Sequence, residues 1–158
     1  MRLTSFTDYA LRVLLYTAAR EEQLTTIAEM QKTFDLSKGH LMKIVHLLST
    51  EGYLHAVRGR SGGVRLGKAP EDINLGQVVR LTEPDFRLVE CFGQVNHCII
   101  SQFCKLPGPL NQALDAFLET LDRHSLRDMM LTRDIFEPTM ERTFPQRGPS
   151  FDLDTETI

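Results

Sequence analysis

All three cysteines of this 158-residue chain, Cys91, Cys98 and Cys104, lie in one segment between residues 91 and 104. Thiolates are soft ligands that select zinc, Cu(I) or iron–sulphur clusters, so three of them in one loop suit a single soft metal centre. An odd number of cysteines fits poorly with a disulfide scaffold, although free cysteines are also common as small buried residues. The spacing does not match the Cys-x-x-Cys patterns of common zinc or ferredoxin sites, so the rest of the chain has to decide the chemistry.

The charge of the chain is unevenly distributed. Residues 1–70 contain ten Lys or Arg against six Asp or Glu, whereas residues 71–158 contain eight against fifteen, and the overall net charge of -3 conceals this difference. A basic first half indicates contact with phosphates. The short apolar run at 13–19 is neither a membrane span nor a signal peptide, so the sequence predicts a cytoplasmic protein. The absence of a catalytic constellation or cofactor loop predicts that it is not an enzyme.

Three capped helices are predicted in the first half of the chain. The stretch Ser5–Asp8 has the form of a capping box and predicts a helix that runs to about Arg20. A second capping box, Thr26–Glu29, opens a short helix, and Ser37 caps a third helix that ends at Gly52. Two helices joined by a tight turn describe a helix-turn-helix. The residues near the start of its second helix that we expect at DNA are Ser37, Lys38, His40 and Lys43.

A short hairpin is predicted directly after this recognition helix. Two alternating segments, Tyr53–Val57 and Val64–Leu66, flank a glycine-rich basic turn. Such a hairpin is the wing of a winged helix, and Arg58 and Arg60 at its tip are suited to a minor groove or to phosphates. A lone helix pair or basic turn is often only structural, but this order of elements favours DNA binding. The predicted fold is therefore mainly α, a winged helix-turn-helix with a small β-hairpin wing.

A further pair of helices is predicted in the second half. Asn74 can cap a fourth helix that breaks before Pro84, and after Pro107 an apolar stripe recurs at helical spacing. A small winged domain offers little cover for this stripe, so packing against the same helix of a second chain is favoured over a role in the chain's own core. The stripe consists of Leu110, Leu114, Phe117, Leu118 and Leu121.

The sequence resembles the family of winged-helix repressors typified by NsrR, a nitric-oxide sensor, and IscR, a regulator of iron–sulphur cluster biogenesis. The resemblance extends to about Asp128, and the blocks that carry it, besides the three cysteines, are Met1–Arg12, Ser37, His40–Ile44 and Arg58–Leu66. It implies a homodimer that binds a palindromic promoter site. It also implies one iron–sulphur cluster per subunit, either 2Fe-2S or 4Fe-4S, with the ligands Cys91, Cys98 and Cys104.

The resemblance also bears on the fourth ligand and on the operator. IscR-like proteins use a histidine three residues after the third cysteine, where this chain has Pro107, which favours the NsrR branch. NsrR-like proteins carry an acid at the place of Asp8 that can reach the partner subunit's cluster, so Asp8 is the candidate fourth ligand, although it also completes the Ser5 capping box. His97 is a poorer candidate because it adjoins Cys98. Gly39 stands where close relatives have asparagine, so we expect a different operator sequence.

The resemblance implies a repressor that leaves DNA when nitric oxide nitrosylates the cluster, which derepresses nitrosative-stress genes. Three alternatives stay open: an IscR-like iron–sulphur or redox-responsive regulator, a non-regulatory redox protein, and a DNA-binding protein with structural zinc or bare thiols. The predicted organisation is a winged-helix domain at 1–82, a cluster-binding loop at 83–105, a dimerisation helix at 106–128, and an extension at 129–158 that is disordered from about 145.

Overall fold

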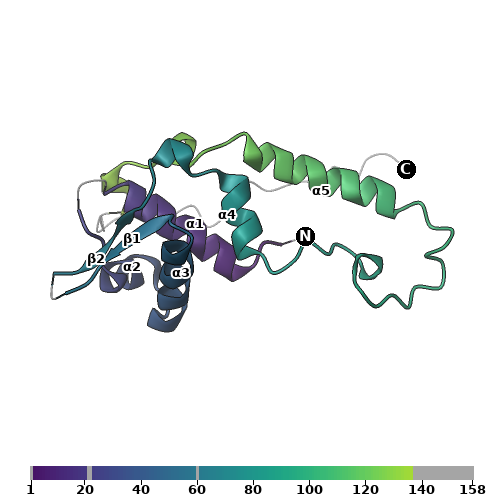
Figure 1. Ribbon diagram of the computed structural model, residues 1–158, viewed down its shortest axis with the longest axis horizontal. Coiled ribbons are helices and arrows are strands. Elements are labelled where there is room, and N and C mark those ends of the chain that lie inside the picture. Colours follow the sequence, from purple (N-terminus) through teal and green to yellow (C-terminus); the bar gives the residue numbers. More distant parts are fainter. Residues whose placement is uncertain (1, 21–22, 60, 137–158) are drawn as a thin grey trace.

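The computed structural model describes residues 2–20, 23–59 and 61–136 (Figure 1). Five helices and one hairpin follow in the order α1 (Ser5–Ala18), α2 (Ile27–Phe34), α3 (Lys38–Thr50), β1 (Leu54–Val57), β2 (Gly63–Leu66), α4 (Leu75–Thr82) and α5 (Pro107–Asp122). The predicted winged helix-turn-helix is confirmed, whereas the predicted disorder from about residue 145 lies outside the described residues. No helix in the described part of the chain is long and apolar enough to cross a membrane.

Helix α1 begins differently from the prediction. Its N-cap is Thr4, whose hydroxyl accepts a hydrogen bond from the Thr7 N–H at 3.3 Å, so the predicted Ser5 capping box is wrong. A contact distant in sequence selects Thr4, because the Glu83 carboxylate accepts from its N–H at 2.7 Å and from its hydroxyl at 3.1 Å. Ser5 is therefore the first helical residue, and α1 ends at Ala18 rather than at about Arg20.

The helix-turn-helix follows the local signals in the sequence. Thr26 and Glu29 form the predicted capping box at the start of α2, and Ser37 caps α3 as predicted. Between these helices Asp35 adopts a left-handed conformation with φ of 52°, which a short polar side chain tolerates and which ends α2 abruptly. Helix α3 then ends before Gly52, whose φ of 74° suits glycine.

The wing is an antiparallel hairpin in which Leu54 pairs with Leu66 and Val57 pairs with Gly63. A third segment joins it, because Thr25 and Val64 exchange backbone hydrogen bonds of 2.8 Å. This bridge ties the chain just before α2 to the second wing strand. The wing is thus fixed to the helix-turn-helix by main-chain bonds as well as by side-chain packing.

The hydrophobic core surrounds α1, which contacts α3, α4 and β2. Most of the side chains on its inner faces are excluded from solvent, including Leu14 and Tyr16. Helices α2 and α3 contribute buried side chains on one face each, as expected for amphipathic helices. The core residues supplied by these two helices are Met30, Leu41, Ile44, Val45 and Leu48.

The carboxyl end of α5 docks on the start of α4. Gly76 makes room for it, because a Cβ there would overlap the Asp122 carboxylate. That carboxylate accepts hydrogen bonds from both terminal nitrogens of Arg80. Asn74 Nδ2 also donates to the Asp122 carbonyl at 2.7 Å. The hydrogen bonds from Arg80 hold the pKa of Asp122 below its usual range. The contact therefore combines a steric seat with charge-assisted bonds.

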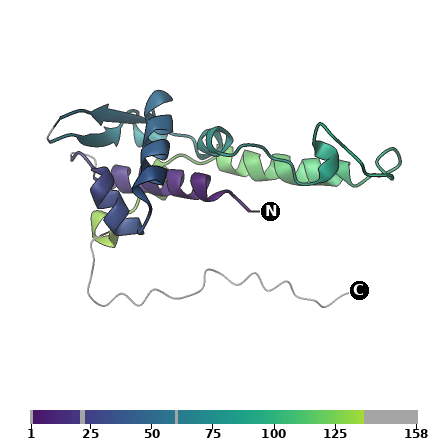
Figure 2. The ribbon, with the colours of Figure 1, turned by 90° about the horizontal axis from the view of Figure 1, so that it is seen from below.

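The predicted helix over 106–128 is too long, because α5 ends at Asp122. Residues 123–136, which we call the return segment, run from α5 to the winged domain. Within this segment Leu126 is fully buried in the core, and its N–H donates to the Ile73 carbonyl at 2.8 Å. Burial of this leucine requires the helix to end. Figures 1 and 2 show that α5 and the cysteine segment project from the side of the winged domain opposite the wing.

The glycines of the fold offer a matched pair of stability tests. A Cβ at Gly67, beside the wing, would lie 2.5 Å from the Gly52 carbonyl oxygen, whereas a Cβ at Gly39 would meet no atom within 4 Å. We expect Gly67→Ala to lower the free energy of unfolding by about 1–3 kcal/mol, since backbone has to move. We expect Gly39→Ala to raise it by up to about 1 kcal/mol through helix propensity. Chemical denaturation of both variants measures this difference, and equal changes in the two would contradict the structure.

Candidate nucleic-acid interface and cysteine segment

The start of α3 presents an exposed, cationic surface. Leu41, Ile44, Val45 and Leu48 of this helix are buried, which leaves the other side chains of its first turns exposed to solvent. Neither Lys38 nor Lys43 has an ion-pair partner within the described ranges. Two unpaired lysines at one helix end are suited to phosphate contacts. The exposed side chains of this surface, which we call the reading face, are Ser37, Lys38, His40, Met42 and Lys43.

Ser37 combines its predicted capping role with a place on the reading face. Its hydroxyl oxygen accepts a hydrogen bond from the His40 N–H at 3.3 Å and so caps α3. The side chain is exposed, and its hydroxyl proton is free to donate outward. Ser37 therefore both fixes the start of the recognition helix and lies on its outer surface.

The wing carries the second part of the predicted interface. Arg58 follows the last residue of β1 and is exposed at the turn of the hairpin. Gly59 has φ of 123°, a conformation that L side chains rarely adopt, so the tight turn requires glycine there. Arg60, the other arginine predicted to contact DNA, lies outside the described residues.

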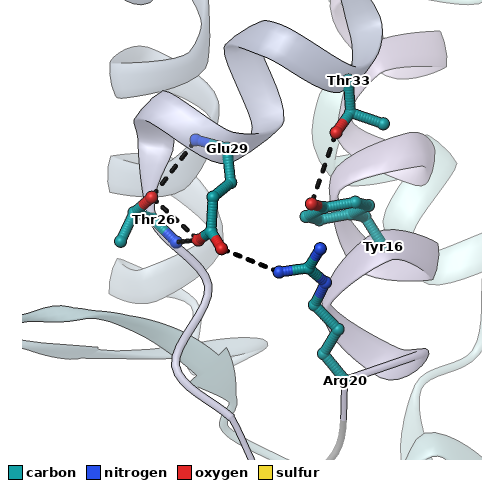
Figure 3. A network of polar contacts seen from close by, with 5 residues as sticks. All are labelled: Tyr16, Arg20, Thr26, Glu29 and Thr33. Atoms are coloured by element: carbon teal, nitrogen blue, oxygen red, sulfur yellow. Dashed lines mark hydrogen bonds and ion pairs between the residues drawn. The ribbon is translucent and has the colours of Figure 1, made fainter. Parts of the chain in front are cut away.

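A polar network that the sequence did not predict holds α2 against α1 (Figure 3). Arg20, just after α1, pairs with Glu29 at 2.8 Å while its guanidinium lies over the Tyr16 ring, 4.6 Å from the centroid. The Tyr16 hydroxyl is 3.3 Å from the Thr33 hydroxyl. The sequence predicted the capping box of Thr26 and Glu29. It did not predict the ion pair between Glu29 and Arg20, because these two residues lie on different elements.

The charge state of this network depends on pH. Burial raises the pKa of Glu29, but hydrogen bonds from Thr26 and the ion pair with Arg20 outweigh burial and hold its pKa below the usual 4.5. A carboxylate whose pKa is lowered in the folded state stabilises that state above its unfolded-state pKa. The stabilisation is lost as the pH falls through the lowered pKa, because protonation ends the pairing with Arg20.

The three cysteines are free thiols, and each is half-buried. Cys91 lies in the 3-10 turn Glu90–Phe92, the Cys98 N–H donates to Asn96 Oδ1 at 3.0 Å, and the Cys104 N–H donates to the Ile100 carbonyl at 2.9 Å. In the part of the chain that the structure describes, no three His, Cys, Asp or Glu side chains gather as a metal site. The segment also exposes several large apolar side chains, namely Val95, Ile99, Ile100 and Phe103.

Asp8, the predicted fourth ligand, lies on α1 and is held by a residue one turn further along. Arg12 Nε donates to Asp8 Oδ1 at 3.0 Å, and Arg12 Nη2 donates to Asp8 Oδ2 at 2.7 Å. Both side chains are 46% exposed, so the carboxylate remains accessible from solvent despite this pairing. The guanidinium fixes its orientation.

A helix-turn-helix with a tethered wing and a cationic, exposed start of its second helix defines a winged-helix DNA-binding protein. Comparison with known proteins narrows this class. A family model, Rrf2, described as an iron-dependent transcriptional regulator, matches residues 3–132. The chain belongs to the Rrf2 family. It is a transcriptional regulator and not an enzyme.

Individual relatives agree with this family. The HTH-type transcriptional regulator NsrR of Bacillus licheniformis is 49% identical over 136 residues, which cover 85% of this chain and 95% of that protein. T. potens IscR has the same fold, with a TM-score of 0.63 at 21% identity over 82% of this chain and 85% of that one. CymR of B. subtilis, a global cysteine regulator, also shares the fold, with a TM-score of 0.63 at 22% identity over 87% and 99% of the two chains.

The residues of the cysteine segment fit an iron–sulphur cluster by the chemistry of their donors. Three thiols that are free of disulfides and partly accessible are the ligands that such clusters use. Among the described residues, helix α5 begins at Pro107, three positions after Cys104, so no imidazole is available there. The fourth ligand that IscR-like proteins take from this position is therefore not available here.

The contribution of the reading face can be measured through the salt dependence of DNA binding. Lys43→Ala should weaken binding to a random-sequence duplex several-fold and lower the slope of log K against log salt by about 1, because one phosphate contact is lost. Arg123→Ala removes an exposed cation at the end of α5, outside the reading face, and should leave the slope unchanged. Equal slopes for the two variants would refute the assignment of Lys43 to the interface.

Proposed function

We propose that this chain is a nitric-oxide-responsive transcriptional repressor that binds a palindromic promoter site as a homodimer and carries one iron–sulphur cluster per subunit. The proposal rests on the attachment of a three-cysteine segment, through α5, to the winged-helix domain. We call this domain, with its helix-turn-helix and wing, the reading head. Such an arrangement joins a reactive centre to DNA recognition within one chain. The HTH-type transcriptional regulator NsrR of Bacillus licheniformis, at 49% identity, supports the role in transcription regulation.

The dimer is supported by the incomplete burial of the apolar stripe on α5, whose side chains are only half-buried within the chain. No residue of this helix is buried, although its apolar stripe runs along most of its length. An apolar face of this kind is stabilised by packing against the same helix of a second copy, which is the usual isologous arrangement. In the dimer the two recognition helices would lie about 34 Å apart, one turn of DNA, and read a palindrome.

The cluster would be held by Cys91, Cys98 and Cys104, with Asp8 reaching it from the partner subunit. When bound, it would supply iron that reacts with nitric oxide. Arg12 orients the Asp8 carboxylate through two hydrogen bonds, and the carboxylate remains partly exposed to solvent. The reducing cytoplasm, where we expect the protein to act, keeps the thiols available as ligands.

The route from the cysteine segment to the reading face follows packed elements. The amino end of α5 adjoins Cys104, while its carboxyl end is fixed to α4 by the Arg80–Asp122 pair. Helix α4 packs on α1, which supports α3. Three thiolates bound to one cluster would hold the cysteine segment and the amino end of α5 in place. Loss of the cluster would remove this constraint. A change in the spacing of the two heads lowers affinity steeply, because phosphate contacts of one head are lost.

The visible spectrum of the anaerobically purified protein tests the cysteine assignment. We expect absorption near roughly 400 nm, typical of thiolate–iron centres, that decreases during a nitric-oxide titration together with affinity for promoter DNA. Cys98→Ser should lower both the absorption and the iron content, whereas Ser101→Ala in the same segment should change neither. A colourless, iron-free wild-type protein that still binds DNA would disprove the cluster while leaving the winged helix intact.

The role of Asp8 has its own test. Asp8→Ala should shift the visible spectrum and change the rate of the response to nitric oxide, because an oxygen donor is replaced at one position. Asp115→Ala, which removes an exposed carboxylate from α5, serves as the control. If Asp8→Ala leaves both the spectrum and the nitric-oxide response unchanged, Asp8 is not a ligand.

A further inference from the structure

The return segment reaches the helix-turn-helix from outside it. It first crosses the start of α4, where the Leu75 N–H donates to the His124 carbonyl at 3.0 Å, and then buries Leu126. Its last described residue, Phe136, packs against the hydrophobic core. Figure 2 shows this yellow-green end of the ribbon against α2. The return segment therefore connects α5 directly to α2, the first helix of the helix-turn-helix.

Phe136 completes a cluster of three aromatic rings. Its ring meets Tyr16 of α1 edge to face, with centroids 5.1 Å apart, and meets Phe34 of α2 at 6.1 Å. Tyr16 and Phe34 themselves meet at 5.5 Å and 70°. Each ring comes from a different element, and the near-perpendicular contacts are the arrangement that aromatic quadrupoles favour.

The cluster lies where it can set the direction of α3. Phe34 is the last residue of α2, and only Asp35 and Leu36 separate it from Ser37, the N-cap of α3. The other end of α2 is fixed independently, because Glu29 pairs with Arg20 (Figure 3). The ring contacts of Phe34 therefore fix the end of α2 from which the recognition helix departs.

From this geometry we infer that Phe136 is a positioning residue for DNA recognition: it holds Phe34, and through it the turn that aims α3, without touching DNA itself. This inference rests on the DNA-binding function proposed above. Phe136 lies outside residues 3–132, which the family model matches. Because the return segment continues from α5, it also gives α5 a second connection to the reading head, separate from the one through α4.

The test compares Phe136→Ala with Leu131→Ala, which removes a large apolar side chain, 40% exposed, from the same segment. The DNA probes are a duplex selected from a random pool by the unmodified protein and a random-sequence duplex of equal length. Phe136→Ala should lower the affinity for the selected duplex at least tenfold and the affinity for the random duplex less than twofold. The reason is that base contacts depend on the orientation of α3, whereas contacts to phosphates of any sequence depend on it much less. Leu131→Ala should leave the ratio of the two affinities unchanged.

A purely structural role would lower both affinities by the same factor, through the folded fraction, and an unchanged ratio would overturn the inference. Phe136→Leu keeps an apolar side chain at this position and guards against a variant that fails to fold. It should show a smaller loss of the same ratio.

Hydrogen exchange separates this inference from the proposed function. In Phe136→Ala and Phe136→Leu the amides of His40 and Leu41, which bond to Ser37, should exchange faster without DNA, and in Leu131→Ala they should not. Unchanged exchange in both Phe136 variants would overturn the positioning role. Failure of the unmodified protein to bind any duplex would instead overturn the proposed function.

Discussion

The rest of the structure depends on the burial of α1 from several sides at once. Its inner faces are covered by α3, the second wing strand and α4, and its Tyr16 ring receives a cation on one side and two aromatic edges on others. Close packing leaves such a helix little freedom to shift without disturbing every neighbour. The reading face, the wing and the seat of α5 are therefore positioned with respect to one common support.

The two ends of the molecule have different physical characters. The reading face is cationic, lies on a capped helix and is backed by a packed core, so it is preorganised for phosphates. The cysteine segment contributes no side chain to the hydrophobic core, exposes large apolar side chains and carries three free thiols. A segment of this kind has low local stability, which suits the response to nitric oxide proposed above. Two connections, one through α4 and one through the return segment, join it to the rigid part.

The predictions that succeeded rest on local chemistry. Thr26, Ser37 and Asn74 cap the helices predicted for them, and the hairpin forms around its glycine-rich turn, because each signal acts within a few residues. The prediction at Ser5 failed, since Thr4 is an equally good cap by sequence and only the distant Glu83 carboxylate selects it. The predicted length of the last helix is wrong for a similar reason, because the burial of Leu126 in the core ends the helix early.

By itself the sequence determined the order of helices and wing, the cationic start of α3 and the confinement of all thiols to one segment. These features follow from residue type and spacing, which act at short range. Only the tertiary structure decided which residue caps α1, where α5 ends, and that Arg20, Asp122 and Phe136 tie distant elements together. Such contacts join residues far apart in the chain, so their partners are set by how the elements pack and not by any local pattern.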